Sequence, residues 1–154
     1  MKIDTSEVDL AIRNLQAELT SPSRLSTFFA QVAKFVDIDV KSHFKREAGP
    51  SALGKVISQG TKRWTGLTER AKQKKAKKGT LGKGILVDSG DLKSSLSKFS
   101  SGQSGGLQTT VTYARDHQFG KNGMIARPYL WFSTKVVNKI MNLLSKNIIK
   151  AWDV

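Results

Sequence analysis

Apolar residues recur at helical spacing near the start of the chain and predict a first helix over residues 6–19. They form one stripe, at Val8, Ile12, Leu15 and Leu19. The Ser21-Pro22-Ser23 segment then interrupts the pattern. Either serine can cap a following helix, and proline is well tolerated at a helix start.

A second helix is predicted over residues 23–45, ending before Gly49-Pro50. Its broad apolar face consists of Leu25, Phe28, Phe29, Val32, Phe35, Val36, Val40 and Phe44. Because aromatic side chains bury large areas, its phenylalanines predict the centre of the core. We therefore expect Phe28 and Phe35 to be buried, together with Ile140 of the last helix.

The middle of the chain predicts short strands separated by turns. Ile85–Val87 is an apolar run bounded by glycine, which is typical of a buried strand. Asp88–Asp91 has turn chemistry, and the segment after it predicts a turn of helix passing into a strand. Residues 100–106 are a Gly/Ser-rich hairpin connection, and the alternation over 107–113 predicts a second, half-buried strand.

A final helix is predicted from Ser133 or Thr134, either of which can cap it. Its apolar positions lie three or four apart, at Val136, Val137, Ile140, Leu143, Leu144, Ile148 and Trp152. The order of elements indicates an α+β fold in a single domain spanning residues 1–154. It comprises two N-terminal helices, a small antiparallel sheet and a long C-terminal helix.

Composition narrows the range of functions. The chain of 154 residues fits one compact domain, and it contains no cysteine, which excludes disulfides and sulfur-ligated zinc. The N-terminal residues lack the pattern of a signal peptide, and no apolar run is long enough for a membrane span. We expect a soluble protein with no membrane partner.

Charge is distributed very unevenly. The net charge is +14, yet residues 1–40 hold four basic and six acidic side chains. All of the excess therefore lies after residue 40, where 22 basic residues face six acids. Such a field favours polyanions or an acidic protein as partners.

The densest basic segment lies between Lys62 and Lys83, where nine basic residues are opposed only by Glu69. Like charges repel along a helix, so we interpret residues 66–84 as a flexible basic loop. Its candidate contacts to DNA or to a protein partner are Arg70, Lys72, Lys74, Lys75, Lys77 and Lys78. A solvated loop without a partner is the commoner case, whereas phosphate contacts would be independent of sequence. No aromatic residue lies between Arg70 and Lys83, which argues against base stacking.

Few residues suggest catalysis or metal binding. His117 follows Asp116, but neighbouring side chains need not face each other, and no nucleophile motif accompanies them. Asp88, Asp91 and Asp116 would supply oxygen ligands for a magnesium-dependent nuclease, although turn capping explains the first two more simply. The glycines of residues 79–84 lack the order of a phosphate-binding loop.

Four segments, in order over residues 64–133, together resemble the virion morphogenesis (tail-completion) family of tailed bacteriophages. They are Trp64–Thr68 with the lysine run, Ile85–Leu96, Tyr113–Gly120 and Met124–Ser133. The motif residues are Trp64, Ser89, Gly90, Leu92, Tyr113, His117, Gly120, Arg127 and Pro128. Gly66 stands where the family often has proline, and residues 1–60 match only in helical character.

The motif residues also have a structural interpretation. Gly90 and Gly120 suit positive φ, Pro128 suits an extended entry to the last helix, and Arg127 suits an anchored carboxylate. None of these roles requires catalysis.

The resemblance implies a structural protein of the phage neck or tail, with no catalytic residue, metal or cofactor. It implies a homo-oligomeric ring at the head–tail junction or tail end of the virion, in contact with other neck and tail proteins. Basic loops facing the channel of such a ring would meet packaged DNA. The alternative is a free, sequence-independent nucleic-acid-binding protein that uses the lysine-rich segment, and a nuclease is a third, weaker possibility.

Overall fold

The computed structural model describes residue 13 and residues 16–17, 20–51, 57–58 and 60–152. The fold is mixed helix and strand, as predicted, with two long helices and three small two-stranded sheets in the described residues. The first predicted helix, residues 6–19, falls almost entirely outside the described residues. No helix within the described part of the chain is long and apolar enough to cross a membrane.

Helix α2, Pro22–Arg46, confirms the second predicted helix. Pro22 occupies its first turn, where the missing amide hydrogen removes no intrahelical bond. The helix ends at Arg46 because Glu47 adopts the left-handed conformation, with φ of 51°, and donates its amide hydrogen to the carbonyl of His43. The predicted end before Gly49-Pro50 is therefore close to the observed one.

Each sheet contains two strands. Strand β1, Ala48–Pro50, pairs antiparallel with β3, Thr61–Arg63. Strand β2, Ile57–Ser58, pairs in parallel with β6, Phe132–Ser133. Strands β4, Ser97–Ser100, and β5, Gly105–Gln108, form the predicted hairpin.

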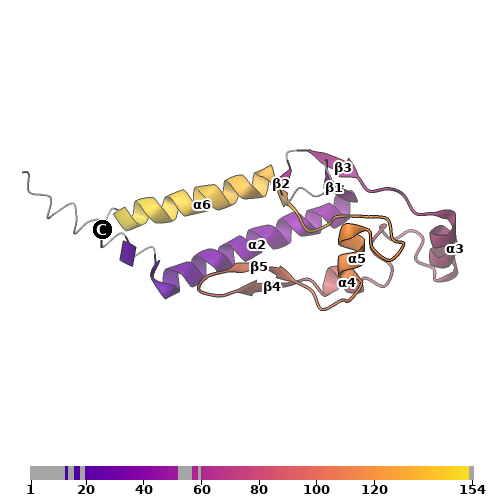
Figure 1. The fold of residues 1–154 in the computed structure, drawn as a ribbon, viewed down its shortest axis with the longest axis horizontal. Helices are drawn as coiled ribbons and strands as arrows, with labels where there is room; N and C mark the ends of the chain where they lie inside the picture. The colour runs from indigo at the N-terminus through magenta and orange to yellow at the C-terminus, as the bar shows by residue number, and fades with distance from the viewer. Residues whose placement is uncertain (1–12, 14–15, 18–19, 52–56, 59, 153–154) are drawn as a thin grey trace, which may run out of the picture.

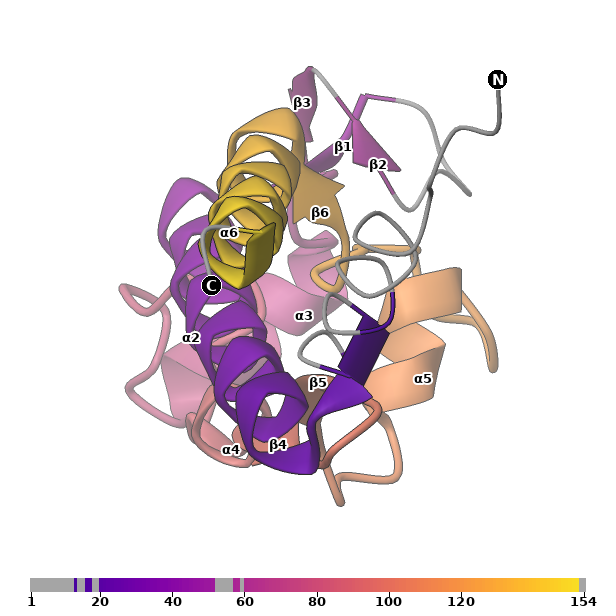
Figure 2. The same cartoon turned by 90° about the vertical axis from the view of Figure 1, so that its left-hand side faces the viewer.

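The hairpin packs closely on α2. A Cβ atom on Gly105 would lie only 2.4 Å from the carbonyl oxygen of Phe29, so this position requires glycine. In Figures 1 and 2, α2 lies between this hairpin on one side and the C-terminal helix on the other. The layers are thus helix, helix and hairpin.

Two strand predictions need correction. Residues 85–87 form a turn, because their backbone groups are bonded to side chains: Glu47 accepts from the amide of Ile85, and Lys75 donates to the carbonyl of Val87. The strand predicted over 107–113 is β5, which ends at Gln108. The residues after it lead instead into helix α5, Ala114–Phe119. The predicted helical turn passing into a strand is confirmed by α4, Asp91–Ser94, followed by β4.

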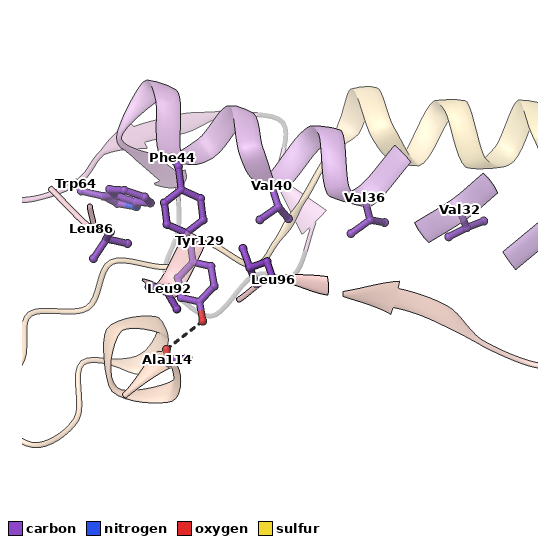
Figure 3. Packing of buried hydrophobic residues seen from close by; sticks show 10 residues of the cluster. All are labelled: Val32, Val36, Val40, Phe44, Trp64, Leu86, Leu92, Leu96, Ala114 and Tyr129. Carbon is purple, nitrogen blue, oxygen red and sulfur yellow. Dashed lines mark hydrogen bonds between the residues drawn. The ribbon is translucent and has the colours of Figure 1, made fainter. Parts of the chain in front are cut away.

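The core forms where α2 meets the motif segments. Its buried side chains are Val32, Val36, Val40, Phe44, Trp64, Leu86, Leu92, Leu96, Ala114 and Tyr129 (Figure 3). Valines and Phe44 line the inner face of α2, whereas Phe28 and Ile140 are only partly buried against this cluster. The expectation that Phe35 is buried is wrong, because it faces the last helix, where the Lys139 ammonium lies 5.7 Å from its ring centroid.

The C-terminal helix α6, Thr134–Trp152, confirms the prediction for this end of the chain. Its start is capped by Ser133, whose hydroxyl accepts from the amide of Val136 at 3.3 Å. Asp39 of α2 in turn accepts from the amide and hydroxyl of Ser133 at 2.9 and 2.7 Å. Helix α6 therefore begins at a fixed point and runs back alongside α2 (Figure 1).

Candidate functional site

The basic segment contains a helix, α3, Glu69–Lys77, so the interpretation of residues 66–84 as a loop is wrong for these nine residues. Thr68 caps the helix by accepting from the amide of Ala71 at 3.3 Å, and Glu69 stands in the first turn. Lysines in the last turn complement the helix dipole, which offsets part of their mutual repulsion.

Lys75 anchors this helix to the body of the protein. Its side chain is only 6% exposed, and its ammonium donates to the carbonyls of Lys83, Gly84 and Val87 at 3.2, 2.9 and 3.0 Å. All three protons of the ammonium are therefore used. Lys75 was a predicted contact to DNA or a partner protein, and its burial corrects that prediction.

The other five candidate cations are exposed, but they are not equivalent. Lys72 forms an ion pair with Glu69 at 2.6 Å, and Lys78 forms one with Asp88 at 2.8 Å. The hydrogen bond from Lys78 holds the pKa of Asp88 below its usual value, and the same bond raises the pKa of Lys78. No ion pair is found among the described residues for Arg70, Lys74 or Lys77.

An open cleft of about 460 Å³ separates α3 from the motif residues. Its lining includes Ser89, Gly90, Leu92, Tyr113 and His117, which are five of the nine motif residues. Lysines 74, 75 and 78 form the opposite wall. The structure thus brings the second and third motifs together beside the basic helix, although they are separate in sequence.

Two titratable side chains of the third motif pack against each other at the cleft. The Tyr113 and His117 rings meet edge to face at 5.7 Å, and burial is the main cause that lowers the pKa of His117. Burial likewise raises the pKa of Tyr113, so both groups are neutral near pH 7. The Asp116 carboxylate accepts from the side-chain amide of Asn122 at 3.0 Å.

The three aspartates of the metal hypothesis accept hydrogen bonds from protein side chains. Asp88 accepts from Lys78 and Thr80, and Asp91 accepts from Ser89 at 2.6 Å. Within the described ranges, no group of three potential ligands lies close enough to hold a metal ion. Gly90, which starts α4, has φ of 101° and confirms the expected positive φ.

The remaining motif residues form a second cluster, which holds the segment before α6. Trp64 donates its indole N–H to the carbonyl of Pro128 at 3.0 Å. Arg127 donates to the carbonyls of Thr65 and Gly66 at 3.1 and 3.0 Å, so its fork binds backbone rather than the carboxylate expected from the sequence. These bonds join the first motif to the fourth.

Gln118 is a central residue of this cluster that sequence reasoning missed. Its side-chain oxygen accepts from the amides of Tyr129 and Leu130, and its nitrogen donates to the carbonyl of Leu130. The Tyr129 hydroxyl donates to the carbonyl of Ala114 at 3.2 Å (Figure 3). The hydrogen bonds of the Gln118 side-chain amide thus take the place of strand pairing for Tyr129 and Leu130, which lie in a segment without regular structure. A glutamine beside His117 carries no pattern that predicts this role.

His43, on α2 next to Phe44, is a core residue. It is 2% exposed, stacks on Trp131 with ring centroids 4.3 Å apart, and donates from Nδ1 to the carbonyl of Tyr129. Gly120, which ends α5, has φ of 69°, so the expected positive φ is confirmed here as well.

Comparison with known proteins adds one positive finding. The model of the phage virion morphogenesis family matches residues 3–148. Searches of curated proteins and of solved structures gave no significant match.

Proposed function

Because the chain belongs to the phage virion morphogenesis family, we propose that it is a structural protein acting in tail completion or head–tail joining of a tailed phage or prophage. The match across residues 3–148 is the observation that carries this proposal. Family membership supports a role in building the virion. The step in assembly, the head–tail junction as the site of action and the absence of an enzymatic activity belong to the proposal.

The use of the motif residues supports a structural role. The Trp64 indole donates to the carbonyl of Pro128, and Arg127 donates to the carbonyl of Thr65, next to Trp64. Leu92 is buried in the core. Residues with this many structural bonds stabilise a shape, whereas a catalytic group must remain available to a substrate. The shape itself is what an assembly protein presents to its neighbours.

An exposed apolar face on α6 fits assembly with further copies of the chain. Met141, Leu144, Ile148 and Ile149 recur at helical spacing and are between 37% and 60% exposed. A surface helix of a monomer normally presents polar residues at such positions. We assign this face to a neighbouring copy in a homo-oligomeric ring, since a head-to-tail contact closes into a ring when its rotation permits.

The proposed function is tested by deleting the gene from its phage or prophage and examining lysates by electron microscopy. The expected result is filled heads and tails that are separate, or tails of aberrant length, with infectivity restored by the gene in trans. Normal, infectious virions in the deletion strain would overturn the proposal.

The contact between copies has its own test. Light scattering coupled to size exclusion should give an oligomer for the parent and a lower mass for the Met141→Ser/Ile149→Ser variant. Ser145→Ala, an exposed change on the same helix, should leave the mass unchanged. An unchanged mass in the double variant would mean that another face forms the contact.

The alternative function is a free protein that binds nucleic acid without reading its sequence. The uncompensated cations of α3 are the observation that favours it. A purified monomer with tight DNA binding, together with normal virions in the deletion strain, would support this alternative over an assembly role.

A further inference from the structure

One side of α3 carries a row of exposed cations. Arg70, Lys74 and Lys77 are spaced four and three residues apart, which puts them on one side of a helix. All three are exposed, and no ion pair is found for them among the described residues, in contrast to Lys72 and Lys78. We call these three residues the cationic row.

The body of the protein holds the row in place. Lys75 projects from a different side of α3 and is fastened to three backbone carbonyls, which fixes the helix that carries the row; Lys74 of the row also lines the cleft. At about 1.5 Å rise per residue, the three positions extend over about 10 Å of helix. Like charges at this spacing destabilise a helix, and an anionic partner would remove that repulsion.

The chemistry of α3 selects among anionic partners. Its only apolar residues are two alanines, Ala71 and Ala76, so it lacks the aromatic or aliphatic anchors typical of a protein interface. It also lacks aromatic side chains on which single-stranded bases would stack. Lysine and arginine alone suffice for contacts with phosphate oxygens.

From these observations, we propose that the cationic row of Arg70, Lys74 and Lys77 binds the phosphate backbone of duplex DNA without reading its sequence. In Figure 1, α3 lies at the end of the molecule opposite the C-terminal end of α6. The DNA contact and the apolar face of α6 are therefore at separate ends and do not compete. The inference does not depend on the proposed role in tail completion.

The test measures binding of the full chain to a fluorescent duplex of about 30 base pairs, by anisotropy, between 50 and 200 mM KCl. The variant is Arg70→Gln/Lys74→Gln/Lys77→Gln. A matched control, Lys98→Gln/Lys121→Gln/Lys146→Gln, removes the same number of charges from exposed lysines on other elements. Circular dichroism and thermal melting of each variant establish that its fold is retained.

The parent should bind two unrelated duplexes equally, with an affinity that falls steeply as salt increases. If all three side chains contact phosphates, the row variant should reduce the slope of log K against log salt by up to about 2.7. The parent would then lose about 40-fold more affinity than the row variant between 50 and 200 mM salt. The control should keep most of the parent's slope.

Two results would overturn the inference. Equal losses in the row variant and the control would mean that net charge alone attracts DNA. Unchanged DNA binding in the row variant, combined with loss of binding to poly-glutamate, would identify an acidic protein surface as the partner of α3.

Discussion

Replacing Lys75 by Met should destabilise the protein although the residue belongs to a run of lysines. The change keeps an unbranched apolar side chain but removes the donor from three carbonyl oxygens, those of Lys83, Gly84 and Val87. Hydrogen bonds from a charged donor contribute about 1.5–3 kcal/mol each to the free energy of unfolding. The sum for three such bonds is an upper limit, and the net loss in the variant is well below it. Desolvation of the ammonium in the parent, and water entering from the adjacent cleft in the variant, both reduce the loss. We expect a decrease of about 2–4 kcal/mol in the free energy of unfolding.

Urea denaturation followed by tryptophan fluorescence measures this change, and the neighbouring lysine provides the control. Lys74→Met makes the same chemical substitution one position earlier, at an exposed side chain, and should change stability by less than about 0.5 kcal/mol. Amide hydrogen exchange should increase in α3 and in residues 83–87 of the Lys75 variant. Equal stabilities for the two variants would refute the assignment of Lys75 as an anchor.

Three further predictions concern the motif segments. Gly120→Ala should lower the free energy of unfolding by about 2 kcal/mol or more, because φ is 69° and the new Cβ would lie 2.9 Å from Ala126. The control Gly66→Ala places its Cβ in open space and should change the free energy of unfolding by less than about 0.5 kcal/mol. Tyr129→Phe should destabilise by about 1–3 kcal/mol, because the carbonyl of Ala114 loses its buried donor; a neutral result by denaturation would contradict the bond. Burial raises the pKa of Tyr129 to about 12, so its protonated phenol stabilises the fold fully below pH 10 and this contribution is lost as pH rises toward 12. Tyrosinate absorbance developing below pH 10 in the folded protein would refute that shift.

Hydrophobic periodicity predicted the long helices well because they are amphipathic and their ends carry local signals. Pro22 at the start of α2 and the Ser133 cap of α6 depend only on neighbouring residues. The β4–β5 hairpin could equally be predicted from the sequence, since a Gly/Ser-rich connection separates its strands. The direction of the apolar face of α2 was predicted less well. The phenylalanines were expected at the centre of the core, whereas three valines and Phe44 are buried there and Phe28 is only partly buried.

The basic helix was misinterpreted because its stability comes from contacts distant in sequence. Repulsion within the run was visible, but of the carbonyls that bind Lys75, those of Lys83 and Gly84 end the predicted loop, and that of Val87 lies in a turn predicted as a strand. The two errors share a cause. Residues 83–87 have backbone acceptors available for Lys75 only because they do not pair in a sheet. A pattern of apolar and polar residues does not report where backbone hydrogen bonds go.

The resemblance located the motif residues, but only the structure explains why so many are polar or small. Residues 121–131 contain no helix or strand, so their buried backbone groups need partners from side chains, which Gln118 and Trp64 supply. Arg127 donates to the carbonyls of Thr65 and Gly66, which lie just before the N-cap of α3. These bonds connect the segment before α3, which carries the cationic row, to the segment that leads into α6, which carries the apolar face. The spacing between these two proposed contact surfaces would determine how neighbours are joined, and a backbone held by polar side chains would help to preserve that spacing.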